Sequence, residues 1–124
     1  EIIAIIRMSK VNATKKALVD IGICGLHAMK VMGRGKMQVD FSMLDGLGAR
    51  EEIGGILANG LSQGSRLIPK RLLTILVNDQ DAVKVVEKII EVNSEGNKGD
   101  GKIFVVPLLD AVRVRTGERG EAAV

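Results

Sequence analysis

The chain is poor in the residues that cross-link, stack or ligate. Its 124 residues contain one cysteine (Cys24), one histidine (His27), two prolines and neither tryptophan nor tyrosine. A single cysteine cannot form an internal disulfide, which indicates a reducing compartment and makes the cytoplasm the expected location. The sequence also offers no His, Cys or carboxylate cluster with metal-ligand spacing and no hydroxyl residue in a nucleophile motif. We therefore expect a ligand-binding protein and not an enzyme.

Long apolar runs and aromatic residues are scarce as well. The apolar runs are far shorter than the roughly 20 residues that cross a bilayer, and we expect neither a signal peptide nor membrane insertion. The composition, 46% hydrophobic and 27% charged, is that of one globular domain over 1–124. The formal net charge is +3, but only Phe41 and Phe104 could stack on bases. We expect the excess charge to attract small anions, and we expect no nucleic-acid partner.

Hydrophobic patterning predicts the order strand, helix, strand twice along the chain. Apolar runs rich in β-branched residues predict strands over about 1–7, 26–32, 71–77 and 102–107. In the first helix Asn12 is the expected cap and Gly22 the expected end. Asp79 or Asp81 is expected to cap the second helix. The expected buried faces are Val11, Thr14, Leu18 and Ile21 in the first helix, and Val83, Val86 and Ile90 in the second.

Two strand–helix–strand units predict an α+β fold of the ferredoxin-like type, βαββαβ, with a four-stranded antiparallel sheet and both helices on one face. The predicted strands are apolar on both faces, whereas the helices cover only one. An exposed apolar sheet is unusual in a soluble monomer. We therefore expect a homo-oligomer whose sheets pack against one another.

A long segment, about 34–69, separates the two halves and contains no convincing strand. It is rich in glycine, and a connection of this length is normally functional or disordered. Within it, the stretch REEIGGILANGL has apolar residues at helical spacing, interrupted by two glycines. Two interpretations stay open: a marginal helix that forms on a partner, or a mobile loop with incidental apolar residues.

The stretch GNKGDGK, residues 96–102, predicts an anion-binding turn. Gly96, Gly101 and Lys102 match a mononucleotide-binding loop, but Ile103 replaces the hydroxyl residue that would hold magnesium. Such a loop runs from a strand into a helix, whereas this stretch is expected to run from a helix into a strand. What remains is a glycine-rich turn whose backbone N–H groups can surround an anion, with Lys102 as a point charge at its exit.

Two arginines follow in the stretch RVRTGERG. On a strand, Arg113 and Arg115 would project from the same face, where an anion can lie between them. Together with Lys102 they predict polyphosphate binding at about micromolar levels. The alternative, that both arginines pair with surface acids such as Glu118, stays open. By residue type alone, the single His27 is expected to be structural.

Several of these motifs together resemble the PII nitrogen-regulatory signal proteins. The similar stretches are IIAIIR at the start, GRGK after the second predicted strand, IPK before the third, GDGKIFV, and the highly specific AVRVRTGERGEAA. The resemblance covers 1 to about 37 and 70–124. It implies a ferredoxin-like fold, a trimer with its sheets packed inside, and ATP or ADP bound in the clefts between subunits.

The resemblance also implies a set of ligand-binding residues. The nucleotide-binding set is Gly33, Gly35, Gly99, Asp100, Gly101, Lys102, Arg113 and Arg115, with His27 in place of the family's common threonine near the base. The set for 2-oxoglutarate, which binds beside the Mg²⁺ of ATP, is Lys36, Met37, Gln38 and Lys70, with Gln38 as the expected contact to the metal.

In the PII family the long loop contacts target proteins. The length of the loop and the stretch VMGRGK most resemble the branch that inhibits nitrogenase, in which a paired paralogue is common. We expect a regulator of nitrogen metabolism that senses ATP/ADP and 2-oxoglutarate, with nitrogenase as its target. A regulator of an ammonium transporter or of glutamine synthetase is the alternative. Tyrosine-linked nucleotidylation is impossible without tyrosine, and Ser42, Ser62 and Ser65 are the candidates for phosphorylation instead.

Two other functions could be built on the same residues. One is an ATP-hydrolysing or phosphotransfer enzyme built on the 96–102 stretch, which lacks a magnesium-holding hydroxyl and a convincing base. The other is a structural trimer with vestigial clefts.

Overall fold

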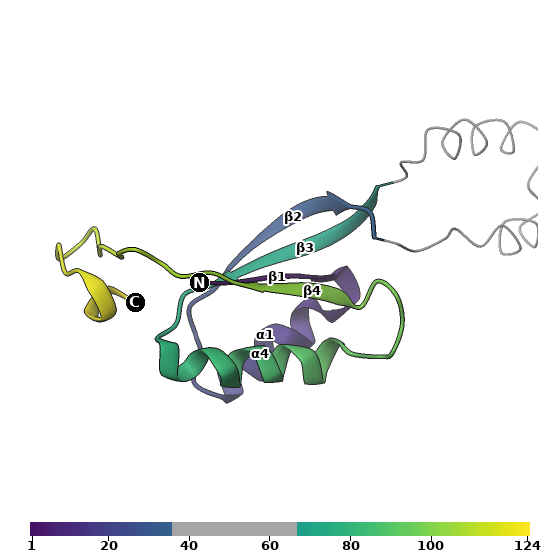
Figure 1. Cartoon of the computed structure of the whole chain (residues 1–124), viewed down its shortest axis with the longest axis horizontal. Coiled ribbons are helices and arrows are strands. Elements are labelled where there is room, and N and C mark those ends of the chain that lie inside the picture. Colours follow the sequence, from purple (N-terminus) through teal and green to yellow (C-terminus); the bar gives the residue numbers. More distant parts are fainter. Residues whose placement is uncertain (36–66) are drawn as a thin grey trace, which may run out of the picture.

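A four-stranded antiparallel sheet packs against two helices in the computed structural model, which describes residues 1–35 and 67–124 (Figure 1). The sheet has the order β2-β3-β1-β4, and each neighbouring pair is antiparallel. Its strands are β1 (Ile2–Arg7), β2 (His27–Gly33), β3 (Ile68–Ile75) and β4 (Gly101–Val105). The helices are α1 (Val11–Asp20) and α4 (Asp79–Asn93), with short 3-10 turns at Met8–Lys10 and Gly120–Ala123. This confirms the predicted ferredoxin-like α+β fold.

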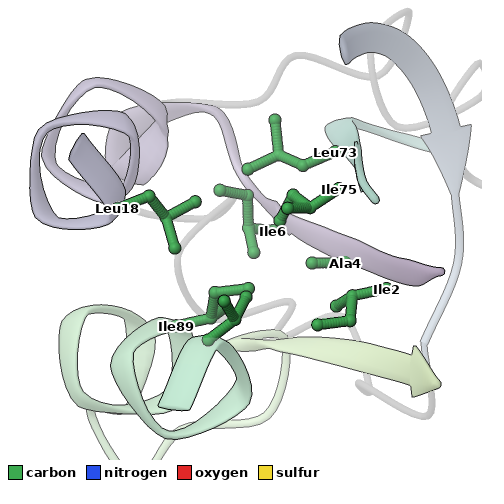
Figure 2. Close-up of a cluster of buried hydrophobic side chains, with 8 residues drawn as sticks. Ile2, Ala4, Ile6, Leu18, Leu73, Ile75 and Ile89 are labelled. Carbon is green, nitrogen blue, oxygen red and sulfur yellow. The ribbon is translucent and has the colours of Figure 1, made fainter. Parts of the chain in front are cut away.

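The core lies between the sheet and the helices, which cover the same face (Figure 1). Burial alternates along β1: Ile2, Ala4 and Ile6 are buried, whereas the residues between them are half-buried. Figure 2 shows Leu18 of α1 and Ile89 of α4 pointing toward these strand residues. The complete buried cluster is Ile2, Ala4, Ile6, Leu18, Leu73, Ile75, Val85 and Ile89.

Two polar side chains, Thr14 and Asn93, are buried between the helices and are joined by a hydrogen bond. The Asn93 amide nitrogen donates to the Thr14 hydroxyl at 3.0 Å and to the Ile89 carbonyl at 2.9 Å. The Thr14 hydroxyl in turn donates to the Lys10 carbonyl at 2.7 Å. Because a buried polar group is costly only when it lacks a partner, this chain of hydrogen bonds can join α1 to α4 inside the core.

The buried side of α4 differs from the predicted one. Val85 and Ile89 face the core, whereas the predicted Val83 and Ile90 are 66% and 51% exposed, and Val86 lies between the two sides. Apolar residues form two adjacent stripes along this helix, so their spacing alone does not indicate which stripe faces the core. The choice depends on Asn93, which a hydropathy pattern assigns to the surface and the hydrogen bond to Thr14 holds inside.

The predicted helix caps are wrong, although the helices themselves are confirmed. The chain leaves β1 directly into a 3-10 turn, so α1 starts after Lys10, and Asn12 lies within the first turn of the helix. Asn78 occupies the cap position of α4, without a side-chain hydrogen bond, and Asp79 and Asp81 lie in the first turn. There, carboxylates favour the helix through its dipole. Gly22 ends the α1 region as predicted, with a φ of +89°.

The sheet face opposite the helices is apolar. Cross-strand partners share a face, so the pairs Ile3 with Phe104 and Ile5 with Leu72 lie on this open face together with Met29, the partner of Leu72 on β2. Met29 and Phe104 are 62% and 45% exposed. No helix in 1–35 or 67–124 covers this face, as the prediction of an apolar, uncovered sheet requires.

Candidate anion-binding site

The α4–β4 turn, residues 94–100, has a backbone that requires glycine. Gly96 and Gly99 have φ values of +75° and +93°, and Gly101, the first residue of β4, has a φ of +135°. A Cβ atom on Gly101 would lie 2.4 Å from the Ile5 carbonyl oxygen, because β4 pairs closely with β1 there. The turn therefore runs from helix to strand, as predicted, in a conformation that side-chain-bearing residues rarely adopt.

The side chain of Asp100 organises the turn from within. One of its carboxylate oxygens accepts hydrogen bonds from the backbone N–H groups of Glu95 at 2.7 Å and Asn97 at 3.1 Å. The hydrogen bond from Glu95 lowers the pKa of Asp100 and that from Asn97 adds to it, whereas partial burial acts in the opposite direction. The N–H groups of Glu95 and Asn97 thus already donate to the Asp100 carboxylate. An external anion can bind only the N–H groups that follow Asn97 in the turn.

Arg7, at the end of β1, holds the outer side of the same turn. Its guanidinium donates to the Gly99 carbonyl at 3.1 Å and to the Lys98 carbonyl at 3.2 Å. It also forms ion pairs with Glu95 at 3.1 Å and with Asp100 at 3.3 Å. Sequence reasoning did not identify Arg7. The signal in the sequence that could have identified it is a cation at the end of the apolar stretch IIAIIR.

Glu95 has a second cationic partner in Lys10. The Lys10 ammonium lies 2.6 Å from the carboxylate. The hydrogen bond from Lys10 is the main cause of the lowered pKa of Glu95, and the charges of Lys10 and Arg7 act in the same direction. The α4–β4 turn is therefore attached to the β1–α1 junction by two charged residues.

Lys70 is the one residue of the predicted 2-oxoglutarate set that lies in the described part of the chain. Its ammonium donates to the Gly99 carbonyl at 2.7 Å, and Lys70 is the cross-strand partner of Arg7. Burial lowers the pKa of Lys70, the neighbouring charge of Arg7 adds to this, and Asp100 opposes it. The structure thus brings the start of β3, where the long segment returns to the sheet, against the α4–β4 turn. Lys36, Met37 and Gln38 lie outside the described residues.

The other residues predicted near a nucleotide lie at both ends of the sheet. Gly33 pairs with Ile68 at the end where Lys70 lies, and Gly35 follows it. His27 pairs with Thr74 at the other end of β2, about 13 Å along the strand from the row of Lys70. Lys102 is the cross-strand partner of Ile5 and so belongs to the open face.

Arg113 and Arg115 do not lie on a regular strand, so that prediction is wrong. After β4 the chain folds back on itself: Val112 pairs with Arg119 as an isolated bridge, and Arg115 lies in the turn between them. Arg113 pairs with Glu118 and donates to the Ala122 carbonyl at 2.8 Å. For Arg113, the alternative of pairing with a surface acid is therefore the one found.

The segment 108–124 also lies away from the turn. It leaves the sheet at the end of β4, whereas the α4–β4 turn enters at the start of the same strand (Figure 1). Within one chain the structure does not bring Arg113 and Arg115 beside Lys102.

A hollow of about 410 Å³ lies next to the turn, between α4 and β4. Its lining is largely apolar, and the residues are Ile6, Val86, Ile89, Ile90, Asn93, Ser94, Asp100, Gly101, Lys102 and Ile103. Among the described residues, Lys102 is the one cation in its lining, and neither Arg7 nor Lys70 is part of it.

Two further properties concern the described residues as a whole. Over 1–35 and 67–124, no group of three or more His, Cys, Asp or Glu residues is placed to hold a metal ion. In the same ranges, no helix is both long enough and apolar enough to span a membrane.

Comparison with known proteins identifies the family. Residues 1–118 match the family model described as "Nitrogen regulatory protein P-II". The chain belongs to the P-II family. Proteins of this family are signalling regulators, typically trimers that act on target proteins, and they generally bind ATP or ADP and 2-oxoglutarate. The chain is accordingly a P-II-type regulator of nitrogen metabolism.

Individual relatives narrow this further. The chain is 46% identical over 129 residues to the "Nitrogen fixation nifHD region GlnB-like protein 2" of Methanobacterium ivanovii, with 100% of the chain and 98% of the relative covered. It is 46% identical over 124 residues to the protein of that description from Methanococcus maripaludis, with the same coverage. A solved structure, Arabidopsis thaliana PII bound to citrate, superposes on 98% of the chain and 85% of its own, with a TM-score of 0.70 and 32% identity.

Proposed function

We propose that this P-II protein senses ATP or ADP together with 2-oxoglutarate, and that it controls nitrogenase through the long loop, about 34–69. The observation that carries the proposal is the hydrogen bond from Lys70 to the Gly99 carbonyl. It joins the glycine turn that would hold phosphate to the strand on which the long segment returns. A ligand that moves either group changes the base of that segment.

The charges around the turn suit an anionic ligand. The carboxylates of Glu95 and Asp100 are outnumbered by cations in and around the α4–β4 turn, namely Arg7, Lys10, Lys70, Lys98 and Lys102. Burial already destabilises the charged form of Lys70, so a carboxylate or phosphate beside it would recover part of that cost. Mg²⁺ bound with ATP would offset part of the phosphate charge, and we assign its protein contact to Gln38.

The ligand site is proposed to lie between copies of the chain. Gly99–Lys102 and the Arg113–Arg115 segment leave β4 at opposite ends, so one chain supplies only half of a polyphosphate site. The open apolar face, with Met29 and Phe104 exposed, supports the proposal that copies pack through their sheets. A trimer of this kind would place the turn of one copy near the arginines and His27 of the next. A paralogue could take the place of one copy.

Nitrogenase is proposed as the target from the descriptions of the relatives, which name the nifHD region. A regulator of an ammonium transporter or of glutamine synthetase is the alternative. We assign the protein to the cytoplasm and propose that it regulates without turning over nucleotide. Steady ADP release that disappears in Lys102→Ala would contradict the last point.

Three measurements test the proposal in order. Light scattering should give about 40 kDa, three times the 13.2 kDa chain. Calorimetry should show ATP binding, strengthened by 2-oxoglutarate and Mg²⁺. Immobilised protein should then retain nitrogenase from a nitrogen-fixing lysate in a manner that changes with 2-oxoglutarate.

The control is a chain lacking 41–65, which should bind ATP normally and retain no target. If this deletion still binds nitrogenase, the long segment is not the target-binding element. If ammonium transporter or glutamine synthetase is retained in place of nitrogenase, the alternative replaces the proposed target.

A further inference from the structure

We propose that Arg7 is a positioning residue for phosphate binding: it fixes the α4–β4 turn in the form that presents its remaining N–H groups to an anion. Arg7 does not itself contact the ligand in this proposal. The inference rests on the proposed function, because it concerns how the same site acquires its shape.

The geometry of two peptide groups is the first argument. Arg7 donates to two consecutive carbonyls, those of Lys98 and Gly99. In a trans peptide the C=O group and the following N–H group point in opposite directions. With the Lys98 carbonyl turned toward Arg7, the N–H group of Gly99 is directed away from it. Among the hydrogen bonds of the described residues, none uses this N–H group.

Polarisation is the second argument. A hydrogen bond from a charged guanidinium withdraws electron density through the carbonyl, and chains of such bonds strengthen one another. The Gly99 N–H group therefore becomes a better donor because Arg7 holds the Lys98 carbonyl. The N–H group of the next peptide, that of Asp100, already donates to the Asn97 carbonyl at 3.2 Å, so the effect of Arg7 on Gly99 is the one that concerns an external anion.

Charge compensation is the third argument. The Asp100 carboxylate lies within the turn, where it would repel a polyphosphate. Arg7 lies 3.3 Å from it and offsets that charge locally. Each of the three guanidinium nitrogens donates to the turn: Nε to the Gly99 carbonyl, Nη1 to the Glu95 carboxylate and Nη2 to the Lys98 carbonyl. This is why Arg7 is assigned to shape the site and not to bind in it.

The chain offers a matched control for a purely structural role. Lys10 pairs with Glu95, the residue that Arg7 also binds, but it contacts no carbonyl of the turn. Both cations attach the turn to the β1–α1 junction. Only Arg7 fixes the direction of its peptide groups.

The experiment compares Arg7→Gln, Arg7→Lys and Lys10→Gln by calorimetry with ATP, alongside thermal melting of each protein. Losing charge-assisted contacts to the turn should weaken ATP binding by about tenfold or more in Arg7→Gln. Arg7→Lys, which restores the charge but cannot reach both carbonyls, should recover part of that loss. Lys10→Gln, which loses one ion pair of the same turn, should stay within about twofold of wild type.

Arg7→Gln binding ATP as well as wild type would overturn the inference. So would an equal loss in Lys10→Gln, because it would make the effect one of stability alone.

A second readout needs no nucleotide. The Gly99 amide resonance of the ligand-free protein should shift and broaden in Arg7→Gln and stay in place in Lys10→Gln. An unchanged resonance in Arg7→Gln overturns the inference even when the protein folds poorly enough to complicate calorimetry. A wild-type chain that binds no ATP refutes the proposed function, and the amide resonance then still decides whether Arg7 shapes the turn.

Discussion

Replacing Gly101 by alanine should destabilise the protein because this position combines two separate costs. Its φ of +135° is a conformation that costs a side-chain-bearing residue about 1–3 kcal/mol. The new Cβ would lie 2.4 Å from the Ile5 carbonyl oxygen, so β4 would have to move away from β1. Overpacking of this kind costs about 1–3 kcal/mol more. We expect a total of about 3 kcal/mol, or a melting temperature about 10 °C lower in a chain of this size.

The assay is thermal melting by circular dichroism at one fixed protein concentration, because an oligomer melts at a concentration-dependent temperature. Gly25→Ala is the control: nothing lies within 4 Å of the Cβ position, and its φ is not in the positive range. We expect it to change stability by no more than about 0.5 kcal/mol. A Gly101→Ala protein that melts within about 2 °C of wild type would refute the assignment of this glycine to a closely approached, strained position.

Three other substitutions test separate parts of the structure. Arg113→Ala combined with Arg115→Ala should weaken ATP binding at least about a hundredfold in calorimetry, and unchanged affinity would remove both residues from the site. Because the pKa of Lys70 is lowered, its positive charge is lost at a lower pH than that of an ordinary lysine, so 2-oxoglutarate affinity should fall as the pH is raised. The affinity of Lys70→Arg, whose charge persists, should stay level over the same range, and parallel curves for the two proteins would contradict this. Thr14→Val should lower the free energy of unfolding by about 1–3 kcal/mol in a denaturant titration, because it leaves one amide donor of Asn93 without its buried partner. A neutral result would show that the packing of the two helices does not depend on this hydrogen bond.

The sequence predicted the fold because its main signals are local. The continuous apolar run of the first strand and the apolar runs of the other strands can be seen without knowing the fold, and the βαββαβ order allows few topologies. The buried side of α4 was missed because it depends on a hydrogen bond between Asn93 and Thr14, which are 79 residues apart. A periodicity counts apolar residues and cannot find a buried polar residue whose hydrogen-bond partner is distant in sequence.

The candidate site was predictable in its composition and not in its arrangement. The glycines and Lys102 were found because the backbone conformation of a turn and the charge at its exit are properties of neighbouring residues. Arg7 was missed because its partners lie about ninety residues away in sequence, and two of the four are backbone carbonyl groups, which every residue carries. Arg113 was placed on a strand because alternation suggests one, but a strand needs a neighbour, and this segment pairs only with itself.

The glycine turn precedes β4 and the arginines follow it, which has a consequence for experiments that mix two variants of the protein. If the glycine turn at one end of the strand and the arginines beyond the other end belong to the same kind of cleft, two defective proteins can complement each other. A protein with Lys102→Ala and a protein with Arg113→Ala and Arg115→Ala would each bind nucleotide poorly alone. Unfolded together and refolded in equal amounts, they would form trimers in which about a quarter of the clefts combine an intact turn with intact arginines. Nucleotide binding would then return in a mixture of two inactive chains.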